Sequence, residues 1–165
     1  MSPRRVTRAQ LAVVLLLLLF LQFYVRPRLW NARVSPDFLL IGLMLFAMRS
    51  GAGAGAFAGF LVGLIEDTLT PARFGAALLA HTVVGYLAAW GRAVFFADNI
   101  LVNAGFVAVG LWLRDLIVLV ASGTDHRQLL VELTFYSPIQ ALTTAAFALA
   151  VLLTFRALFS VRLDS

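Results

Sequence analysis

Residues 51–75 read GAGAGAFAGFLVGLIEDTLTPARFG, and glycine recurs at every fourth position, at Gly51, Gly55, Gly59 and Gly63. On an α-helix, residues four apart lie along one face, so this spacing predicts a groove almost free of side chains. In a membrane, such a groove lets two helix backbones approach closely and gain van der Waals contact. We therefore expect the glycines to pack against a neighbouring helix of the same chain, in preference to a second protein.

The next position along the same face is Asp67, and Glu66 stands beside it. The C-terminal end of a helix carries partial negative charge, so two carboxylates there need a cation or hydrogen-bond donors. For Asp67 we expect a paired or capping structural role, with a proton or ion pathway as a further alternative. For Glu66 the sequence favours a solvated helix end and a paired role equally.

The composition identifies the kind of protein. The chain has 165 residues, of which 62% are hydrophobic and 13% charged, whereas soluble domains are nearer half apolar and a quarter charged. No charge occurs in residues 9–25 or 100–113, and such stretches approach the ~20 apolar residues that cross a bilayer. The sequence therefore predicts an integral membrane protein with one polytopic domain over residues 1–165.

The apolar segments predict an all-α fold, a compact bundle of six transmembrane helices. Ser35, Pro36 and Asp37 are typical of a helix start, with Ser35 as the N-cap and Pro36 in the first turn. The second and third segments are short for a hydrocarbon layer of ~30 Å, so they extend through their flanks, thin the bilayer or lie inside the bundle. The expected spans are residues 9–25, 36–48, 50–66, 74–90, 100–121 and 133–158.

The charge pattern indicates topology. Six spans place both termini on one side of the membrane, and the basic cluster Arg4, Arg5 and Arg8 favours the cytoplasmic side for both. The formal net charge is +5, the chain has arginine but no lysine, and most of the arginines are spread between the apolar segments. Membrane topology and anionic lipid head groups explain this charge, so no nucleic-acid partner is expected.

Few residues are available for catalysis. The chain has no cysteine and no lysine, which excludes thiolate sites, a P-loop lysine and a Schiff base. His81 stands alone in an apolar segment without a second metal ligand at suitable spacing, so we interpret it as an interhelical hydrogen-bonding residue. We expect no enzyme activity, no cofactor and no metal.

Arg114 and Asp115 interrupt the fifth apolar segment. Charged residues within a span usually face the bundle interior and are paired. Adjacent helical residues point about 100° apart, so these two cannot both face one partner. We predict that Arg114 contacts Asp67 and thereby ties the third span to the fifth.

Two segments carry a family resemblance. They are Ser35-Pro36-Asp37-Phe38-Leu39-Leu40 at the second span, and GFLVGLIED over residues 59–67, followed by Phe74-Gly75. Together they resemble the bacterial rod shape-determining protein MreD family, in which a Pro-Asp pair opens a short helix and a segment ending in aspartate follows. In this resemblance Asp67 takes the place of that aspartate, and Asp115 is similar to a later acidic residue in the fifth span.

The resemblance implies a non-catalytic scaffold subunit of the cell-elongation complex in the bacterial inner membrane. Such a subunit binds MreC directly and helps to control peptidoglycan synthesis and cell shape. Its indirect or transient partners are MreB, a SEDS polymerase and a class B penicillin-binding protein, and it lies among membrane lipids.

The same family looks similar in fold to the substrate-binding subunits of energy-coupling-factor transporters. The alternative function is therefore a vitamin-type uptake subunit, and a proton-coupled carrier is a third possibility. Those uptake subunits dock their partner through small residues on the first helix. The first span here, LAVVLLLLLFLQF, has few small residues, which favours the scaffold.

Overall fold

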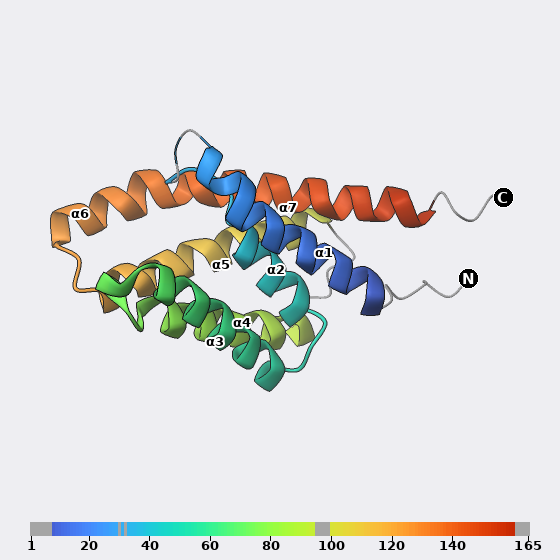
Figure 1. Ribbon diagram of the computed structural model, residues 1–165, viewed down its shortest axis with the longest axis horizontal. Helices are drawn as coiled ribbons and strands as arrows, with labels where there is room; N and C mark the ends of the chain where they lie inside the picture. The colour runs from blue at the N-terminus through green and yellow to red at the C-terminus, as the bar shows by residue number, and fades with distance from the viewer. Residues whose placement is uncertain (1–7, 30, 32, 95–99, 161–165) are drawn as a thin grey trace.

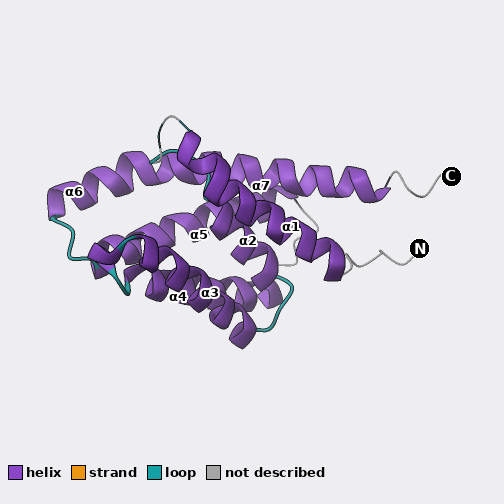
Figure 2. Cartoon of the chain, in the orientation of Figure 1, coloured by secondary structure: helices purple, strands orange, loops and turns teal. Residues whose placement is uncertain are grey.

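The computed structural model describes residues 8–29, 31, 33–94 and 100–160, and this part of the chain is helical with short connections (Figure 2). No strand occurs among these residues, so the predicted all-α class is confirmed. The helices are α1 (Arg8–Phe20), α2 (Phe38–Ala47), α3 (Ala52–Leu69), α4 (Ala76–Val94), α5 (Ile100–Ala121), α6 (His126–Val131) and α7 (Ser137–Ser160). Short helical turns cover Leu21–Val25, Arg26–Arg28, Pro71–Arg73 and Glu132–Tyr136.

Four helical stretches of the described residues are long and apolar enough to cross a membrane: Leu11–Arg28, Ala52–Leu69, Leu101–Ala121 and His126–Thr154. Two shorter apolar helices, Phe38–Ala47 and Ala76–Gly91, accompany them. The chain is thus a helical membrane protein. The beginning of α1 and the end of α7 lie at one end of the bundle, and the α3–α4 turn and the start of α6 lie at the other (Figure 1).

Helix α2 is the centre of the bundle. Its ten residues span about 15 Å, too short to cross the bilayer alone, and it contacts α1, α3, α4, α5 and α7. Leu40, Ile41 and Ala47 have no exposed surface. A helix that is enclosed on all sides is apolar all round, which explains why α2 lacks a polar face.

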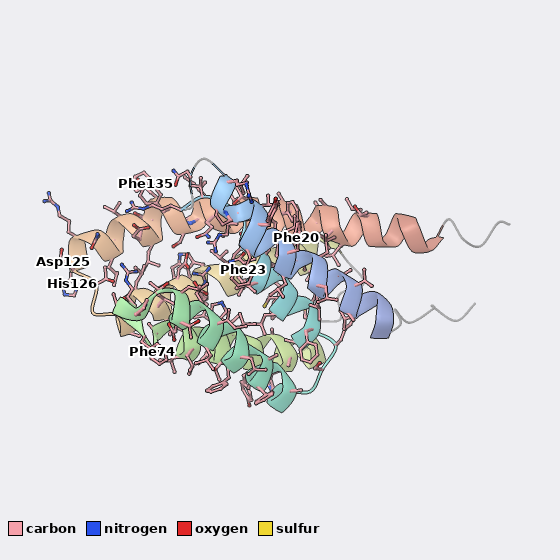
Figure 3. All side chains as sticks on the ribbon, viewed as in Figure 1. Phe20, Phe23, Phe74, Asp125, His126 and Phe135 are labelled. Atoms are coloured by element: carbon pink, nitrogen blue, oxygen red, sulfur yellow. The ribbon has the colours of Figure 1, made fainter. Side chains whose placement is uncertain are left out.

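Helix α1 covers one side of α2. Val14, Leu18 and Gln22 are buried, and their spacing of four residues puts them on a single face toward α2. The opposite face is apolar and exposed, and Figure 3 shows Phe20 and Phe23 on this first span among these side chains. This outer face is where lipid or a partner protein is expected.

The start of α2 differs from the prediction. Asp37, not Ser35, is the N-cap, because its Oδ1 accepts a hydrogen bond of 2.9 Å from the Leu40 N–H. The Ser35 hydroxyl instead donates to the Asn31 carbonyl at 2.6 Å. Pro36 therefore precedes the cap and does not lie in the first helical turn.

The last membrane helix begins earlier than residue 133. Asp125 caps α6 by accepting from the Arg127 N–H at 3.3 Å, and helical structure continues through a π-helical turn, Glu132–Tyr136, into α7. Pro138 has no N–H to donate to an earlier turn. The π-helical turn just before it changes the backbone hydrogen-bond pattern near this missing donor. Asp125 and His126 lie at the outer corner of the bundle where this helix starts (Figure 3).

Candidate functional site

Three of the repeated glycines bring α3 directly against the backbone of α4. Gly55, Gly59 and Gly63 are buried on one face of α3, and a methyl group added to any of them overlaps α4. An ideal Cβ at Gly59 lies 2.0 Å from the His81 carbonyl oxygen, much closer than real Cβ contacts. The corresponding nearest distances are 2.4 Å for Gly55, to the Gly85 carbonyl oxygen, and 2.4 Å for Gly63, to the Leu78 Cα.

The contact is reciprocal at one position and ends before Gly51. A Cβ at Gly85 of α4 lies 2.3 Å from the Gly55 carbonyl oxygen, so both helices need glycine at this crossing. Gly51 is exposed, and no atom lies within 4 Å of the place that a methyl group on it would take. It precedes α3 as an extended N-cap residue with ψ of 162°, so helical spacing no longer applies to it. The predicted groove therefore has three glycines, not four.

Asp67 continues this buried face and caps α4. Its carboxylate accepts hydrogen bonds from the N–H groups of Gly75 at 2.8 Å, Ala77 at 3.1 Å and Leu78 at 2.9 Å. These groups belong to the first turn of α4, where N–H groups have no partner within their own helix. Gly75 has a φ of +98°, a left-handed conformation that glycine adopts without strain and that turns the chain into α4.

The predicted contact between Asp67 and Arg114 is wrong. The glycine face places the N-terminal end of α4 directly beside Asp67, whose carboxylate accepts hydrogen bonds from three peptide N–H groups there. The ion-pair partners of Arg114 lie elsewhere, on α2, α3 and its own helix. The sequence interpretation of Asp67 as a capping residue agrees with this geometry.

Replacing Asp67 with alanine is expected to destabilise the α3–α4 pair by about 2–4 kcal/mol, because it leaves buried N–H donors without an acceptor. Asparagine at this position retains one side-chain oxygen as an acceptor, so Asp67→Asn should cost less than Asp67→Ala. Thermal unfolding of the purified protein in lipid nanodiscs measures both effects. Thr68→Ala, at the exposed neighbouring position, is the control, and equal stability of Asp67→Ala and the control would contradict the capping role.

Arg114 is the centre of a buried charge cluster that joins three helices. Its guanidinium donates to the Asp37 carboxylate at the start of α2, and lies 3.0 Å from Asp115 Oδ1 and 3.9 Å from Glu66 Oε1. Arg114 and Asp115 are at least nine-tenths buried, and Asp37 has no exposed surface. The charge-assisted hydrogen bond to Asp37 is strong and joins α5 to the start of α2, and the ion pair with Glu66 adds an electrostatic link to α3.

Uncharged polar groups complete the cluster at the start of α2. The Asp37 N–H donates to Thr144 Oγ1 at 3.1 Å, and the Phe38 N–H donates to Gln22 Oε1 at 3.1 Å. Gln140 Nε2 donates to the Ser35 carbonyl at 3.2 Å. Side chains from α7 and from the end of the first span therefore bind the backbone that leads into α2.

His81 and Glu66 form a second pair beside the Arg114 cluster. The His81 ring is completely buried, its Nδ1 is 2.9 Å from the Ala77 carbonyl oxygen, and its Nε2 is 3.4 Å from Glu66 Oε2. The Glu66 side chain is only 25% exposed. Of the two alternatives for Glu66, the structure therefore favours the paired role over the solvated helix end.

A cavity of about 250 Å³ adjoins the charge cluster, and its lining includes Arg73 in the α3–α4 turn. Arg33 lines it, with its guanidinium 3.4 Å from Glu132 Oε1 and 5.1 Å from the centre of the Tyr136 ring. Arg73 also lines it, and no carboxylate of the described residues lies within ion-pair distance of Arg73. The lining residues are Arg33, Arg73, Arg114, Asp115, Val118, Leu119, Thr124, Gln128, Glu132, Tyr136, Ser137 and Gln140.

The role of Asp37 as the partner of Arg114 was not recognised from the sequence. Asp37 stands at a helix start, where capping alone explains an aspartate. The signal was the presence of Gln140 and Thr144, four residues apart in an apolar helix, because polar residues on one face of a membrane helix require buried partners.

The charged groups of this site link helices to one another. The charged groups are paired with one another, and the described residues contain no cluster of three or more histidine, aspartate or glutamate side chains able to hold a metal ion. The open part of the site is the cavity, whose lining includes the three arginines Arg33, Arg73 and Arg114 and the two carboxylates of Asp115 and Glu132.

Comparison with known families identifies the chain. A family model described as rod shape-determining protein MreD matches residues 4–162, nearly the whole sequence. Comparisons with curated proteins and with solved structures gave no match. Taken with the helical membrane fold and the buried aspartates of the Pro-Asp and GFLVGLIED segments, the match shows that this chain belongs to the MreD family of rod shape-determining proteins.

Proposed function

We propose that this chain is a non-catalytic scaffold subunit of the bacterial cell-elongation complex, located in the inner membrane with both termini in the cytoplasm. The match to the MreD family over residues 4–162 carries this proposal. In this role the protein binds MreC directly and helps to control peptidoglycan synthesis and cell shape. MreB, the SEDS polymerase and the class B penicillin-binding protein are indirect or transient partners.

The geometry supports a scaffold because the polar groups of the interior bind each other. Arg114 is held by Asp37 and Asp115, and Asp67 is held by the first turn of α4. A carrier needs charged groups that exchange partners during transport, whereas a scaffold needs a fixed outer surface. The vitamin-uptake alternative gains no support from the comparisons, and the likeness in fold to the subunits of energy-coupling-factor transporters stays a prediction.

We assign the contact with MreC to the cavity beside the charge cluster. Both termini in the cytoplasm would place the α3–α4 turn, and with it this cavity, on the periplasmic side. MreC crosses the membrane once, so the segment that follows its span leaves the bilayer on the periplasmic side, at the height of this cavity. Arg33 and Arg73 are exposed enough to pair with carboxylates or peptide carbonyls of that segment, while the apolar outer face of α1 suits a membrane helix.

The double variant Arg33→Glu/Arg73→Glu is expected to reduce copurification of MreC from native membranes by tenfold or more, corresponding to about 1.4 kcal/mol or more. The reason is that two positive charges that line the cavity become negative. Arg127→Glu is the matched control, because Arg127 is exposed at the same end of the bundle and does not line the cavity.

Equal amounts of folded protein in the membrane must be shown for all three versions by size-exclusion chromatography. Unchanged MreC recovery with the double variant would contradict the assignment of the contact to the cavity. Failure of the unmodified chain to copurify MreC at all, or to restore rod shape in cells that lack their own MreD, would contradict the scaffold function itself.

A further inference from the structure

The cavity beside the charge cluster has one more positive than negative side chain in its lining, because three arginines and two carboxylates line it. Each of the two carboxylates has an arginine beside it. Glu132 Oε1 is 3.4 Å from the Arg33 guanidinium, and Asp115 Oδ1 is 3.0 Å from the Arg114 guanidinium. The arginine that remains is Arg73.

Arg73 is therefore the cation of this cavity whose charge is unmatched. It ends the helical turn Pro71–Arg73 between α3 and α4, and it is exposed. Within residues 8–29, 31, 33–94 and 100–160, no carboxylate lies at ion-pair distance from its guanidinium. Asp67, the nearest acidic residue in the sequence, accepts hydrogen bonds from N–H groups of α4 instead. An anion from another molecule can thus pair with Arg73 without displacing an existing partner.

The size of the cavity limits what can enter it. Arg114 and Asp115 line it and are at least nine-tenths buried, so it reaches the edge of the charge cluster. Asp37 and Glu66, the other partners of Arg114, do not line it. A volume of about 250 Å³ accommodates a side chain with several water molecules, whereas a helix, about 10 Å across, does not fit.

We propose that this cavity is a carboxylate-binding site, in which Arg73 pairs with one aspartate or glutamate side chain of MreC. This inference rests on the proposed contact with MreC and specifies the chemistry of that contact. A guanidinium presents parallel N–H donors that match the two oxygens of a carboxylate. One carboxylate also neutralises the single excess charge of the lining. A phosphate group has more acceptor oxygens, and the other two arginines are already held by carboxylates.

Arg33 has a different role in the same cavity. Its guanidinium is 3.4 Å from Glu132 Oε1 and lies over the Tyr136 ring at 5.1 Å, so it joins the segment before α2 to the last membrane helix. Its charge is matched within the chain. We therefore expect Arg73 to select the acidic partner, and the pair of Arg33 and Glu132 to shape the wall of the site.

Copurification of MreC from native membranes separates these two roles. Arg73→Gln should lower the recovery of MreC by about fivefold, since it removes the unmatched cation. The double variant Arg33→Gln/Glu132→Gln removes both members of an ion pair and leaves the net charge of the lining unchanged. It should keep recovery within about twofold of the unmodified chain. Equal losses in the two variants, or no loss with Arg73→Gln at equal amounts of folded protein, would overturn the assignment to Arg73.

The chemistry of the partner can be tested because the chain contains no lysine. Arg73→Lys places a single side-chain amine at the cavity and keeps the positive charge. A water-soluble carbodiimide joins an amine to a carboxylate in direct contact with it by an amide bond, and mass spectrometry locates that bond. In membranes that contain both proteins, we expect the bond to an aspartate or glutamate in the segment after the span of MreC. Arg127→Lys, exposed and outside the cavity lining, is the control and should give no such product.

The outcomes separate this inference from the function on which it rests. A bond from Arg73→Lys to a carboxylate of its own chain or to a lipid, or no bond while MreC still copurifies, overturns the carboxylate site and leaves the scaffold function standing. If the unmodified chain does not copurify MreC, the scaffold function fails, and the carboxylate site fails with it.

Discussion

Gly59→Ala is expected to lose most of its folded protein, although it adds a single methyl group. The new Cβ would lie 2.0 Å from the His81 carbonyl oxygen and 2.9 Å from the Thr82 Cα, both backbone atoms of α4. Backbone cannot move aside as a flexible side chain can, so α3 and α4 must separate. We expect a loss of about 3 kcal/mol or more in stability, at or beyond the upper range for overpacked cores. Gly59→Leu should abolish folding.

The same helix supplies the control. Gly53 is exposed, with open space where a Cβ would lie. Alanine is favoured over glycine within helices, so Gly53→Ala should leave stability unchanged or raise it slightly. Thermal unfolding and size-exclusion profiles in nanodiscs compare the two substitutions directly. If both behave alike, close backbone approach does not hold α3 to α4.

Arg114→Met should destabilise the bundle by about 3–5 kcal/mol, because it leaves the carboxylates of Asp37, Asp115 and Glu66 buried without their shared cation. Methionine keeps much of the length and the apolar stem of arginine, so packing changes little. Arg127→Met at an exposed position should have almost no effect. The amount of folded protein after graded heating reports the difference.

A double-mutant cycle identifies the partner. Asparagine in place of Asp37 can still cap α2 but carries no charge, so Arg114→Met and Asp37→Asn should be strongly non-additive, with a coupling of about 1–3 kcal/mol. Arg114→Met and Asp67→Asn should be additive. Coupling of Arg114 with Asp67 in place of Asp37 would contradict the arrangement of charges described above.

The sequence predicted features that depend on one helix better than features that depend on several. The glycine spacing identified the face of α3 that α4 covers, because residues four apart share a face whatever lies opposite. It extended that face to Gly51, which fails because α3 begins at Ala52. The all-helical membrane class followed from apolar length alone, which is a property of each segment.

Pairing between distant segments was not predictable in the same way. Asp37 and Arg114 are 77 residues apart, and nothing in the local sequence of either distinguishes Asp37 from Asp67 as a partner. Asp67 is not the partner of Arg114 because the tight α3–α4 turn places the N–H groups of Gly75, Ala77 and Leu78 beside its carboxylate. The cavity was also unforeseen, because its lining comes from Arg33, the α3–α4 turn, α5 and the last membrane helix.

The most direct test of the glycine contact is a carbon–carbon distance measurement by solid-state NMR in lipid bilayers. Glycine labelled at Cα and histidine labelled at the carbonyl carbon, in the His126→Gln background, leave His81 as the single labelled histidine. We expect a strong cross-peak from the His81 carbonyl to the Cα of Gly59 and none to Gly53. Absence of the Gly59 cross-peak in folded protein would mean that α3 and α4 do not meet through their backbones, and the structural account would be wrong.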